Sequence, residues 1–452
     1  MTAQQLFVKT ALVCALASAA VATWAQAPVM DLKQVYQAAL EQDATIRASR
    51  ATADSGRERL PQARAGLLPQ ISASAGRNNN NLDTTAPNIL GTPVTTNEKY
   101  LSDNKTLQLR QPLVNMQRWF QFQQAKSVVE EVEANLDRDL QNLVVRVAGV
   151  YFEALMADEQ LDLVLAQKKT YTALVDAAKK GLAAGSGTRT DIDDAQSRLD
   201  MAAAQELEAR QNQDLARRQL QLLVNQPVNQ IAKLNVAALQ LSAPMPANLD
   251  DWTRKAEQAS PEIRAMQARL DAARREVSKA QAGHLPTVDA VAQWSNSGSE
   301  NITRVNSRFE NKTIGLQLNI PLYSGGYVNS TIRQAVAEQT RAEESLEALR
   351  RDLGVRVHKE YRGVSEGVLR VRALEQAARS AEQMMKSTQM SLTAGSRTQL
   401  DVLNAQQQFT LALRDLAQAR LVYLLSKVRL ASLVGDDAMV SVEQVNGSLR
   451  VR

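Results

Sequence analysis

Hydrophobic residues recur every 3.5 positions in two long stretches of the chain. In the stretch that lies in the second half of the chain, this spacing is seen at Val357, Tyr361, Val364, Val368 and Val371. This period is typical of coiled coils, because it keeps one apolar seam facing a partner helix. The pattern therefore predicts long helices that pack side by side. The first stretch carries the spacing over four heptads, at Leu136, Leu140, Leu143, Val147, Val150, Ala154, Ala157, Leu161 and Val164.

A turn motif ends each stretch. Residues 184–196 read AGSGTRTDIDDAQ, and residues 394–406, a constant 210 positions later, read AGSRTQLDVLNAQ, with seven of thirteen positions identical. In each copy a glycine allows the left-handed conformation that closes a helix, and Ser and Thr follow as capping residues. Asp191 or Asp401 then lies in the first turn of the next helix, where the helix dipole favours negative charge. Two helical hairpins in one chain indicate a tandem duplication.

Short segments in which apolar and polar residues alternate precede each long helix. A period of two is typical of β-strands. The polar segment inside each pair, residues 78–93 and 296–311, is predicted to be an exposed loop. Each half should therefore run helix, strand, loop, strand, long helix, turn, helix. The four predicted strands cover about residues 70–76 and 105–112 in the first half, and 286–295 and 312–321 in the second.

Two repeats of about 200 residues follow from these elements. The first, residues 30–240, is predicted to have a long helix to residue 184 and a return helix to residue 224. The second, residues 248–452, is predicted to have a long helix to residue 393 and a return helix to residue 434. The connecting segments, residues 185–190 and 394–399, are called the tip turns below.

Residues 1–25 have the pattern of a secretory signal peptide. Lys9 precedes an apolar run that is too short to span a bilayer, and residues 23–25 form a small-x-small cleavage site. Cys14, the only cysteine, lies inside this segment, so the mature protein is expected to be exported, cysteine-free and without a lipid anchor. After residue 25 we find no run of 18 or more apolar residues, which predicts that no helix spans a membrane.

Composition and charge exclude several functions. The 53 basic and 48 acidic residues among 452 are interspersed, which argues against nucleic-acid binding. No nucleophile-base signature, phosphate loop or zinc motif is present, and His284 and His358 are isolated. We therefore expect no enzymatic activity, no metal site and no cofactor.

Four strands in an exported protein pose a problem of closure. A sheet in lipid cannot leave its edges open, and four strands cannot close a barrel. If these strands lie in a membrane, several chains must share one barrel. Two chains would give eight strands with a filled interior, and three would give twelve strands with a lumen.

The duplicated order, a Leu-Pro pair before each first strand, a proline after each second strand, and above all the motif at residues 394–406 resemble the TolC family of outer-membrane export channels. The resemblance implies a mostly α fold with a small β part: a homotrimer with a twelve-stranded barrel in outer-membrane lipid, four strands per chain, continued by a helical tunnel across the periplasm. It implies a periplasmic adaptor and an inner-membrane RND or ABC transporter as partners. The expected function is a passive export duct, gated at its periplasmic tip, for multidrug efflux, type I protein secretion or both.

The resemblance also assigns roles to residues at the tip. Asp401 matches a family position whose carboxylate faces the pore, and Asn404 falls where the prototype has a second aspartate. Asp191 matches an acidic tip residue, and Asp194 adds a carboxylate nearby, so a trimer would carry rings of charge that select cations. The alternative is that the first-turn aspartates only complement helix N-termini. Arg397 matches an arginine that latches the closed tip.

Two further sets of residues complete the expectations. Aromatic residues at Trp119, Phe120 and Phe122 either form a periplasmic aromatic girdle or pack between helices. A periplasmic coiled-coil scaffold or adaptor without a barrel is the alternative function; it explains the heptads but leaves the alternating segments unexplained. The tip-turn residues expected to contact the adaptor are Gly185, Ser186, Thr188, Gly395, Ser396 and Thr398.

Overall fold

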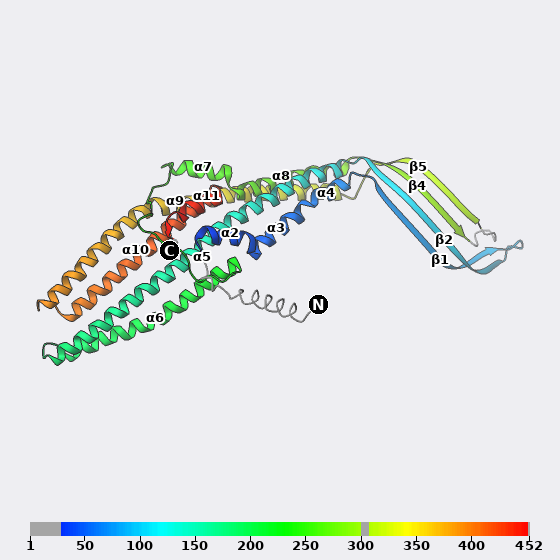
Figure 1. The fold of residues 1–452 in the computed structure, drawn as a ribbon. Coiled ribbons are helices and arrows are strands. Elements are labelled where there is room, and N and C mark those ends of the chain that lie inside the picture. Colours follow the sequence, from blue (N-terminus) through cyan, green and yellow to red (C-terminus); the bar gives the residue numbers. More distant parts are fainter. Residues whose placement is uncertain (1–28, 300–306, 451–452) are drawn as a thin grey trace, which may run out of the picture. The chain divides into compact units, whose positions relative to one another are not determined.

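The computed structural model describes residues 29–299 and 307–450 (Figure 1). The predicted signal peptide lies outside the described residues, as does part of the loop predicted at residues 296–311. The chain divides into two compact units. Unit 1 comprises the chain up to Arg47, Asp139–Ala256 and the chain from Gly354, and unit 2 comprises Ala48–Arg138 and Glu257–Leu353.

Unit 2 contains a four-stranded antiparallel sheet. Its strands are β1 (Gln70–Pro87), β2 (Pro93–Val114), β4 (Thr287–Ser299) and β5 (Ser307–Asn319). They lie side by side in the order β1-β2-β4-β5 (Figure 1), so the hairpin from each half of the chain contributes two neighbouring strands. Among the strands that the structure describes, β1 and β5 lie at the edges of this sheet, so each pairs with a neighbour on one side.

The register gives the sheet one apolar and one polar face. Because successive side chains point to opposite faces, residues opposite one another across the strands share a face. One such row is Ile71, Leu109, Ala292 and Ile314, and the row next to it on the other face is Ser72, Gln108, Gln293 and Thr313.

The strands are longer than the sequence pattern predicted. Residues 78–87 and 93–101, which lie outside the predicted strands, extend β1 and β2, and only Asn88–Thr92 connects them. Alternation marks a strand only where one face is apolar, whereas this extension is polar on both faces. It is held by backbone pairing and by side-chain bonds such as that between the hydroxyls of Thr85 and Thr95 at 2.7 Å. Each strand has 13 to 22 residues, so the predicted strands of seven to ten residues were too short.

Short helices accompany the sheet in unit 2. They are α4 (Arg59–Ala65), α8 (Pro261–Gln281) and the 3-10 turn η1 (Ala282–His284), together with most of α3 (Ala44–Arg57). Ion pairs tie two of them to the beginning of the long helix α5 (Met116–Ala183). Arg57 Nε lies 3.1 Å from Glu133, and Arg264 Nη2 lies 2.6 Å from Asp137.

Unit 1 is built from two helical hairpins (Figure 1). The first joins α5 to α6 (Arg189–Val224), and the second joins α9 (Tyr327–Thr393) to α10 (Gln399–Leu433). The predicted seam contributes Leu143, Val147 and Leu161 to the buried core. A second buried stripe on α5 surrounds Tyr151, whose hydroxyl donates to the carbonyl of Ala232 at 2.9 Å. Tyr361, 210 positions later, likewise donates to a linker carbonyl, that of Ala247.

The two stripes explain one difference from the sequence analysis. Within the described residues, α5 contains an 18-residue window that is apolar and long enough to cross a membrane by length and composition. Half of that window is buried inside the chain. Burial on two sides accounts for an apolar composition that a single coiled-coil seam would not need.

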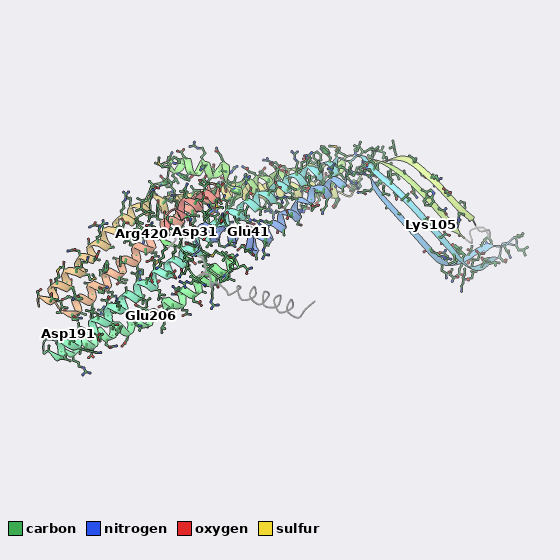
Figure 2. The ribbon with its side chains drawn as sticks, in the orientation of Figure 1. Asp31, Glu41, Lys105, Asp191, Glu206 and Arg420 are labelled. Carbon is green, nitrogen blue, oxygen red and sulfur yellow. The ribbon has the colours of Figure 1, made fainter. Side chains whose placement is uncertain are left out.

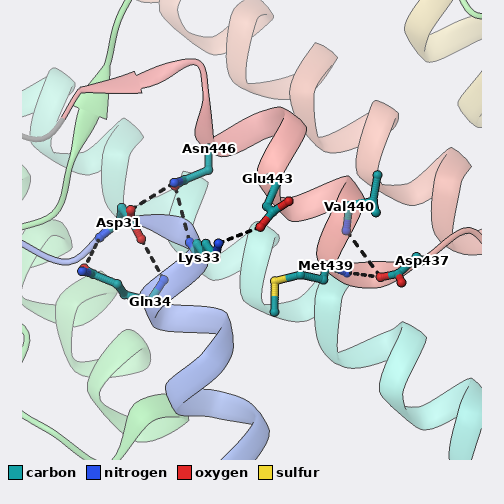
Figure 3. A network of polar contacts seen from close by, with 8 residues as sticks. All are labelled: Asp31, Lys33, Gln34, Asp437, Met439, Val440, Glu443 and Asn446. Carbon is teal, nitrogen blue, oxygen red and sulfur yellow. Dashed lines mark hydrogen bonds and ion pairs between the residues drawn. The ribbon is translucent and has the colours of Figure 1, made fainter.

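Segments near both ends of the chain meet in unit 1 (Figure 3). Asp31 caps α2 (Leu32–Gln42). Asn446, at the end of α11 (Ala438–Asn446), donates to the carboxylate of Asp31 at 3.0 Å. Lys33 forms an ion pair with Glu443 at 2.6 Å. A small antiparallel pair, β3 (Lys233–Leu234) with β6 (Leu449–Arg450), and α7 (Leu249–Ala259) complete the described elements.

Candidate functional site at the tip turns

Each tip turn closes its long helix with the same hydrogen bonds. In the first, Gly185 has φ of 74°, its N–H donates to Leu182 at 3.0 Å, and Ser186 N–H donates to Gly181 at 3.0 Å. These bonds satisfy carbonyls that a helix end leaves without partners, and glycine adopts the required left-handed backbone without strain.

The second turn repeats this geometry. Gly395 has φ of 75°, its N–H donates to Leu392 at 2.9 Å, and Ser396 N–H donates to Ser391 at 3.0 Å. The duplicated motif therefore folds into duplicated turns. The six turn residues expected to meet an adaptor are all exposed in the single chain: Gly185, Ser186, Thr188, Gly395, Ser396 and Thr398.

A capping box begins each return helix. Thr188 Oγ1 accepts from the N–H of Asp191 at 3.2 Å, and one carboxylate oxygen of Asp191 accepts from the N–H and hydroxyl of Thr188 at 2.8 and 2.7 Å. Thr398 and Asp401 form the same box, with distances of 3.2, 2.9 and 2.9 Å. Both aspartates are thus capping residues, and each uses a single oxygen, Oδ2, for the cap.

The charge on Asp401 is held by its surroundings. The backbone N–H of Thr398, then its hydroxyl, and then the positive charge of Arg397 keep the pKa of Asp401 below its usual range. Arg397 Nη1 lies 3.9 Å from the free oxygen Oδ1, and the arginine side chain is 60% exposed. Hydrogen bonds to a carboxylate favour its charged form, so Asp401 carries a fixed negative charge at neutral pH.

The two hairpins are joined by an arginine that the sequence analysis did not single out. Arg198 on α6 donates from Nη2 to Asn404 Oδ1 and from Nη1 to Gln407 Oε1 on α10, both at 2.8 Å. The amide of Asn404 is therefore engaged within its own chain. Position 408, which is 210 residues after Arg198, is Gln408. The duplication therefore gave no signal for Arg198.

A small apolar cluster lies close to the tip turns. Its members are Tyr171, Leu174, Ala202, Val402 and Leu403, and Leu199 and Leu392 pack against them. Because the cluster draws side chains from α5, α6 and α10, it fixes one hairpin against the other near the turns.

Several charged side chains along the hairpins form ion pairs, among them Glu206 and Arg420, which are labelled in Figure 2. Glu206 lies 2.7 Å from both Lys168 and Arg210, and these bonds lower its pKa. Arg420 on α10 lies 2.8 Å from Glu375 on α9. Asp191 and Asp194, both half-buried, lie at the end of the first hairpin. Between residues 29–299 and 307–450, no group of three or more His, Cys, Asp or Glu is arranged to hold a metal ion.

The aromatic residues expected at a membrane border lie in unit 2, in the first two turns of α5. Trp119 is exposed, and Phe120 and Phe122 are half-buried. The rings of Trp119 and Phe122 are 6.1 Å apart, and Lys126 Nζ lies 4.8 Å from the centre of the Phe122 ring. Trp119 and Phe122 thus form an aromatic pair at the start of α5, with the indole of Trp119 exposed.

Comparison with known protein families decides the identity. The family described as outer membrane efflux protein matches residues 35–226 and 252–436, one segment in each half. The chain belongs to this family. The outer membrane efflux proteins are channel and transport proteins, so the chain is an export duct of the outer membrane, as the resemblance to TolC implied.

Curated relatives of this efflux protein span nearly its full length. The alkaline protease secretion protein AprF of Pseudomonas aeruginosa is 33% identical over 92% of this chain and 88% of its own. The proteases secretion protein PrtF of Dickeya chrysanthemi is 31% identical over 90% of this chain and 89% of its own. The outer membrane protein TolC of Escherichia coli is 29% identical over 90% and 82%, respectively.

Solved structures share the fold. CusC, whose crystal structures concern folding and transmembrane channel formation, has a TM-score of 0.77 and covers 90% of this chain and 92% of its own at 17% identity. The duplicated, mostly helical fold with a small antiparallel sheet is therefore that of TolC-like channels.

Proposed function

We propose that this efflux family member is the homotrimeric duct of a type I protein secretion system. The proposal of a trimer is supported by the sheet, which has four strands, two unpaired edges and one exposed apolar face. Edges cannot stay open in lipid, and three copies that pair β1 of one chain with β5 of the next make a closed barrel of twelve strands with a lumen.

The exposed apolar face supports placement in lipid. On the edge strand β5, Ile314 is 89% exposed and Leu316 is 73% exposed in the single chain. Apolar area of this kind costs about 25 cal/mol per Å² in water, whereas lipid chains cover it. The polar face, with Gln108 and Gln293, then lines the lumen.

The helical hairpins also present an unpartnered seam. Leu207, Leu215 and Leu222 lie on one face of α6 and are 71%, 56% and 80% exposed. A neighbouring chain that packs on this face would bury the row, as an exposed apolar helix face in a helical bundle requires. Six hairpins from three chains would then surround one tunnel. Trp119, Phe120 and Phe122 would lie at its border with the membrane.

The cargo is assigned from the relatives. AprF and PrtF are by name protease secretion proteins, and both exceed 30% identity over about nine tenths of this chain. We therefore assign an exported polypeptide as cargo, with a periplasmic adaptor and an inner-membrane ABC transporter as partners. The sequence resemblance implied drugs, protein or both as cargo, with an RND transporter as the other possible pump; drug efflux is the second arm of the test below.

The tip turns are proposed to be the gate and the adaptor contact. Asp401 has one oxygen committed to its capping box, and its other oxygen and its fixed charge are available to the pore. Three copies would form a carboxylate ring that favours cations, with Asp191 and Asp194 adding charge. Asn404 would act as the partner of Arg198 rather than as a filter, and Arg397 would tune the charge of Asp401. The exposed turn residues would meet the adaptor.

Secretion and efflux are separated in one host. The duct is expressed in a strain that lacks its own TolC-type channel but keeps a protease-exporting ABC transporter and its adaptor. Protease in the culture medium, together with a trimer mass for the detergent-purified protein, supports the proposal. Restored drug resistance without secreted protease would refute the assignment of an exported polypeptide as the cargo. A product extracted without detergent would instead favour the periplasmic scaffold and refute the duct.

A further inference from the structure

Positive side chains gather at one border of the apolar face of the sheet. We call this set the distal cations: Arg77, Lys105, Arg308 and Lys312. Arg77 lies six positions after Ile71 on β1, and Lys312 lies two positions before Ile314 on β5. Alternation therefore places these cations on the same face as the apolar rows, at the end away from the helices. Figure 2 labels Lys105 on the sheet.

At this level of the sheet, the cations lie on the apolar face. On the polar face, the rows at the same level are Ser74, Thr106, Ser295 and Asn311, and Gly76, Asn104, Ser297 and Phe309, none of which is ionisable. On the apolar face, the rows nearest the helices contain Gln111, Ala290 and Leu316, and Val114, Val288 and Leu318. Arg110 also lies on the polar face, but it is nearer the helices and paired with Asp289 at 2.5 Å, so the positive charge at the distal level of the sheet is on the apolar face.

Two carboxylates on the same face neutralise part of the charge. Glu310 accepts from the indole N–H of Trp294 at 3.1 Å and pairs with Lys312 at 3.1 Å. Asp103 lies opposite Arg77 in the ladder, and its Oδ1 lies 2.6 Å from the position that a Cβ on Gly298 would occupy. Four cations against two carboxylates leave a formal excess of two positive charges per chain.

The uncompensated charges surround a hollow. Its volume is about 780 Å³, and its lining includes Arg77, Asp103, Lys105, Gly298 and Arg308. Gly298 carries no side chain, and the carboxylate of Asp103 extends over it, so this carboxylate lies in the row between Arg77 and Arg308. The hollow therefore has room for an anionic group between cations of three different strands.

We propose that the distal cations bind the phosphate groups of lipid headgroups in the leaflet that faces away from the periplasm. This inference rests on the proposed placement of the sheet in the membrane. Arginine forks match phosphate oxygens, and each cation near an anionic lipid surface strengthens binding. The apolar rows would contact the acyl chains of the same lipid, with Trp294 at the boundary between chain and headgroup.

Lipid binding is measured on the detergent-purified full-length protein. It is titrated with lipid A, a diphosphorylated glycolipid, and separately with phosphatidylcholine, and bound lipid is counted by native mass spectrometry. The variant R77Q/K105Q/R308Q should bind lipid A on the order of 100-fold more weakly, at roughly fivefold per cation. The matched variant K169Q/K179Q/K180Q loses the same charge from exposed positions on α5 and should bind like the unaltered protein.

Further variants and ligands keep the outcomes separate. D103N removes a carboxylate from the hollow and should tighten lipid A binding. Equal binding by the unaltered protein and R77Q/K105Q/R308Q, equal loss in both triple variants, or equal affinity for phosphatidylcholine would each overturn the inference. Displacement of lipid A by equimolar inorganic phosphate would overturn it in favour of a free-phosphate site. Trimer mass and bilayer conductance from the same sample test the proposed function independently.

Discussion

The guanidinium of Arg198 donates to Asn404 Oδ1 over 2.8 Å and thereby links the return helices of the two hairpins, α6 and α10. The same guanidinium donates to Gln407, also at 2.8 Å. A planar cation that bridges two acceptors on a neighbouring helix restricts how far the hairpins can separate. The structure thus contains a link between hairpins close to the turns that are proposed to be the gate.

Removal of this link should favour the open tip. Arg198→Ala deletes two hydrogen bonds from an exposed cation, which contribute about 0.5–1 kcal/mol. We expect a two- to fivefold higher open probability, measured as single-channel current in a planar bilayer. Arg210→Ala is the control, because Arg210 pairs with Glu206 on its own helix. Equal effects of the two variants would show that loss of charge, rather than the link, is responsible.

Asp401 should retain its charge in mild acid. Its folded-state pKa is lowered, so the stability and charge that it provides are present above the ordinary aspartate pKa of about 3.9 and are lost as the pH falls through the lower folded value. Block of the current by a trivalent cation should therefore persist at pH 4. Asp401→Ala should weaken the block at least about tenfold, as loss of a charged ring predicts.

Removal of the neighbouring arginine, Arg397, should have the opposite effect on the block by a trivalent cation. Arg397→Ala removes the positive charge that lies 3.9 Å from Asp401 and should tighten the block. Asp415→Asn, farther along α10 and paired with Arg414, is the control and should leave the block unchanged. A block that is insensitive to both Asp401 and Arg397 would place the constriction elsewhere.

The apolar cluster beneath the turns should account for much of the stability of the tip. Leu403 is fully buried, and Leu403→Ala is expected to cost about 2–5 kcal/mol. Leu400, one turn earlier on α10 and 46% exposed, should cost less than about 0.5 kcal/mol when replaced by alanine. The rate of tryptic cleavage at the tip measures both. Similar rates for the two variants would mean that the cluster does not hold the hairpins together.

Glu159 on α5 should destabilise the protein at neutral pH. Desolvation is the main cause that raises its pKa, the carboxylates of Asp162 and Asp158 add to it, and Lys233 and Arg420 oppose it. An acid with a raised folded-state pKa stabilises below its ordinary pKa of about 4.3 and loses that contribution as the pH rises.

Glu159→Gln should therefore raise the thermal midpoint at pH 7.5 and have no effect at pH 4. The gain in free energy of unfolding should be less than about 1 kcal/mol, because the site is half-exposed. Glu153→Gln, six residues earlier and exposed, is the control. A stabilisation that is independent of pH would show that the glutamate acts through packing rather than through its charge.

Local patterns in the sequence specified the parts of this protein that depend on neighbouring residues alone. The heptad spacing around Leu143 and Val147 predicted helices, because a buried stripe requires that period. The paired motifs predicted both turns and the first-turn positions of Asp191 and Asp401, because capping uses residues three positions apart. Alternation around Ile314 marked the part of β5 that has an apolar face.

Tertiary structure decided the features that join distant segments. No local pattern could extend β1 to Pro87, because a strand polar on both faces is defined only by its partner strand. Nor could one pair Arg198 with Asn404, which lie 206 positions apart and outside the repeat offset of 210. The cation row of Arg77 and Arg308 likewise exists only in the register of the sheet. Periodicity records which face of an element is buried, whereas folding determines which element covers it.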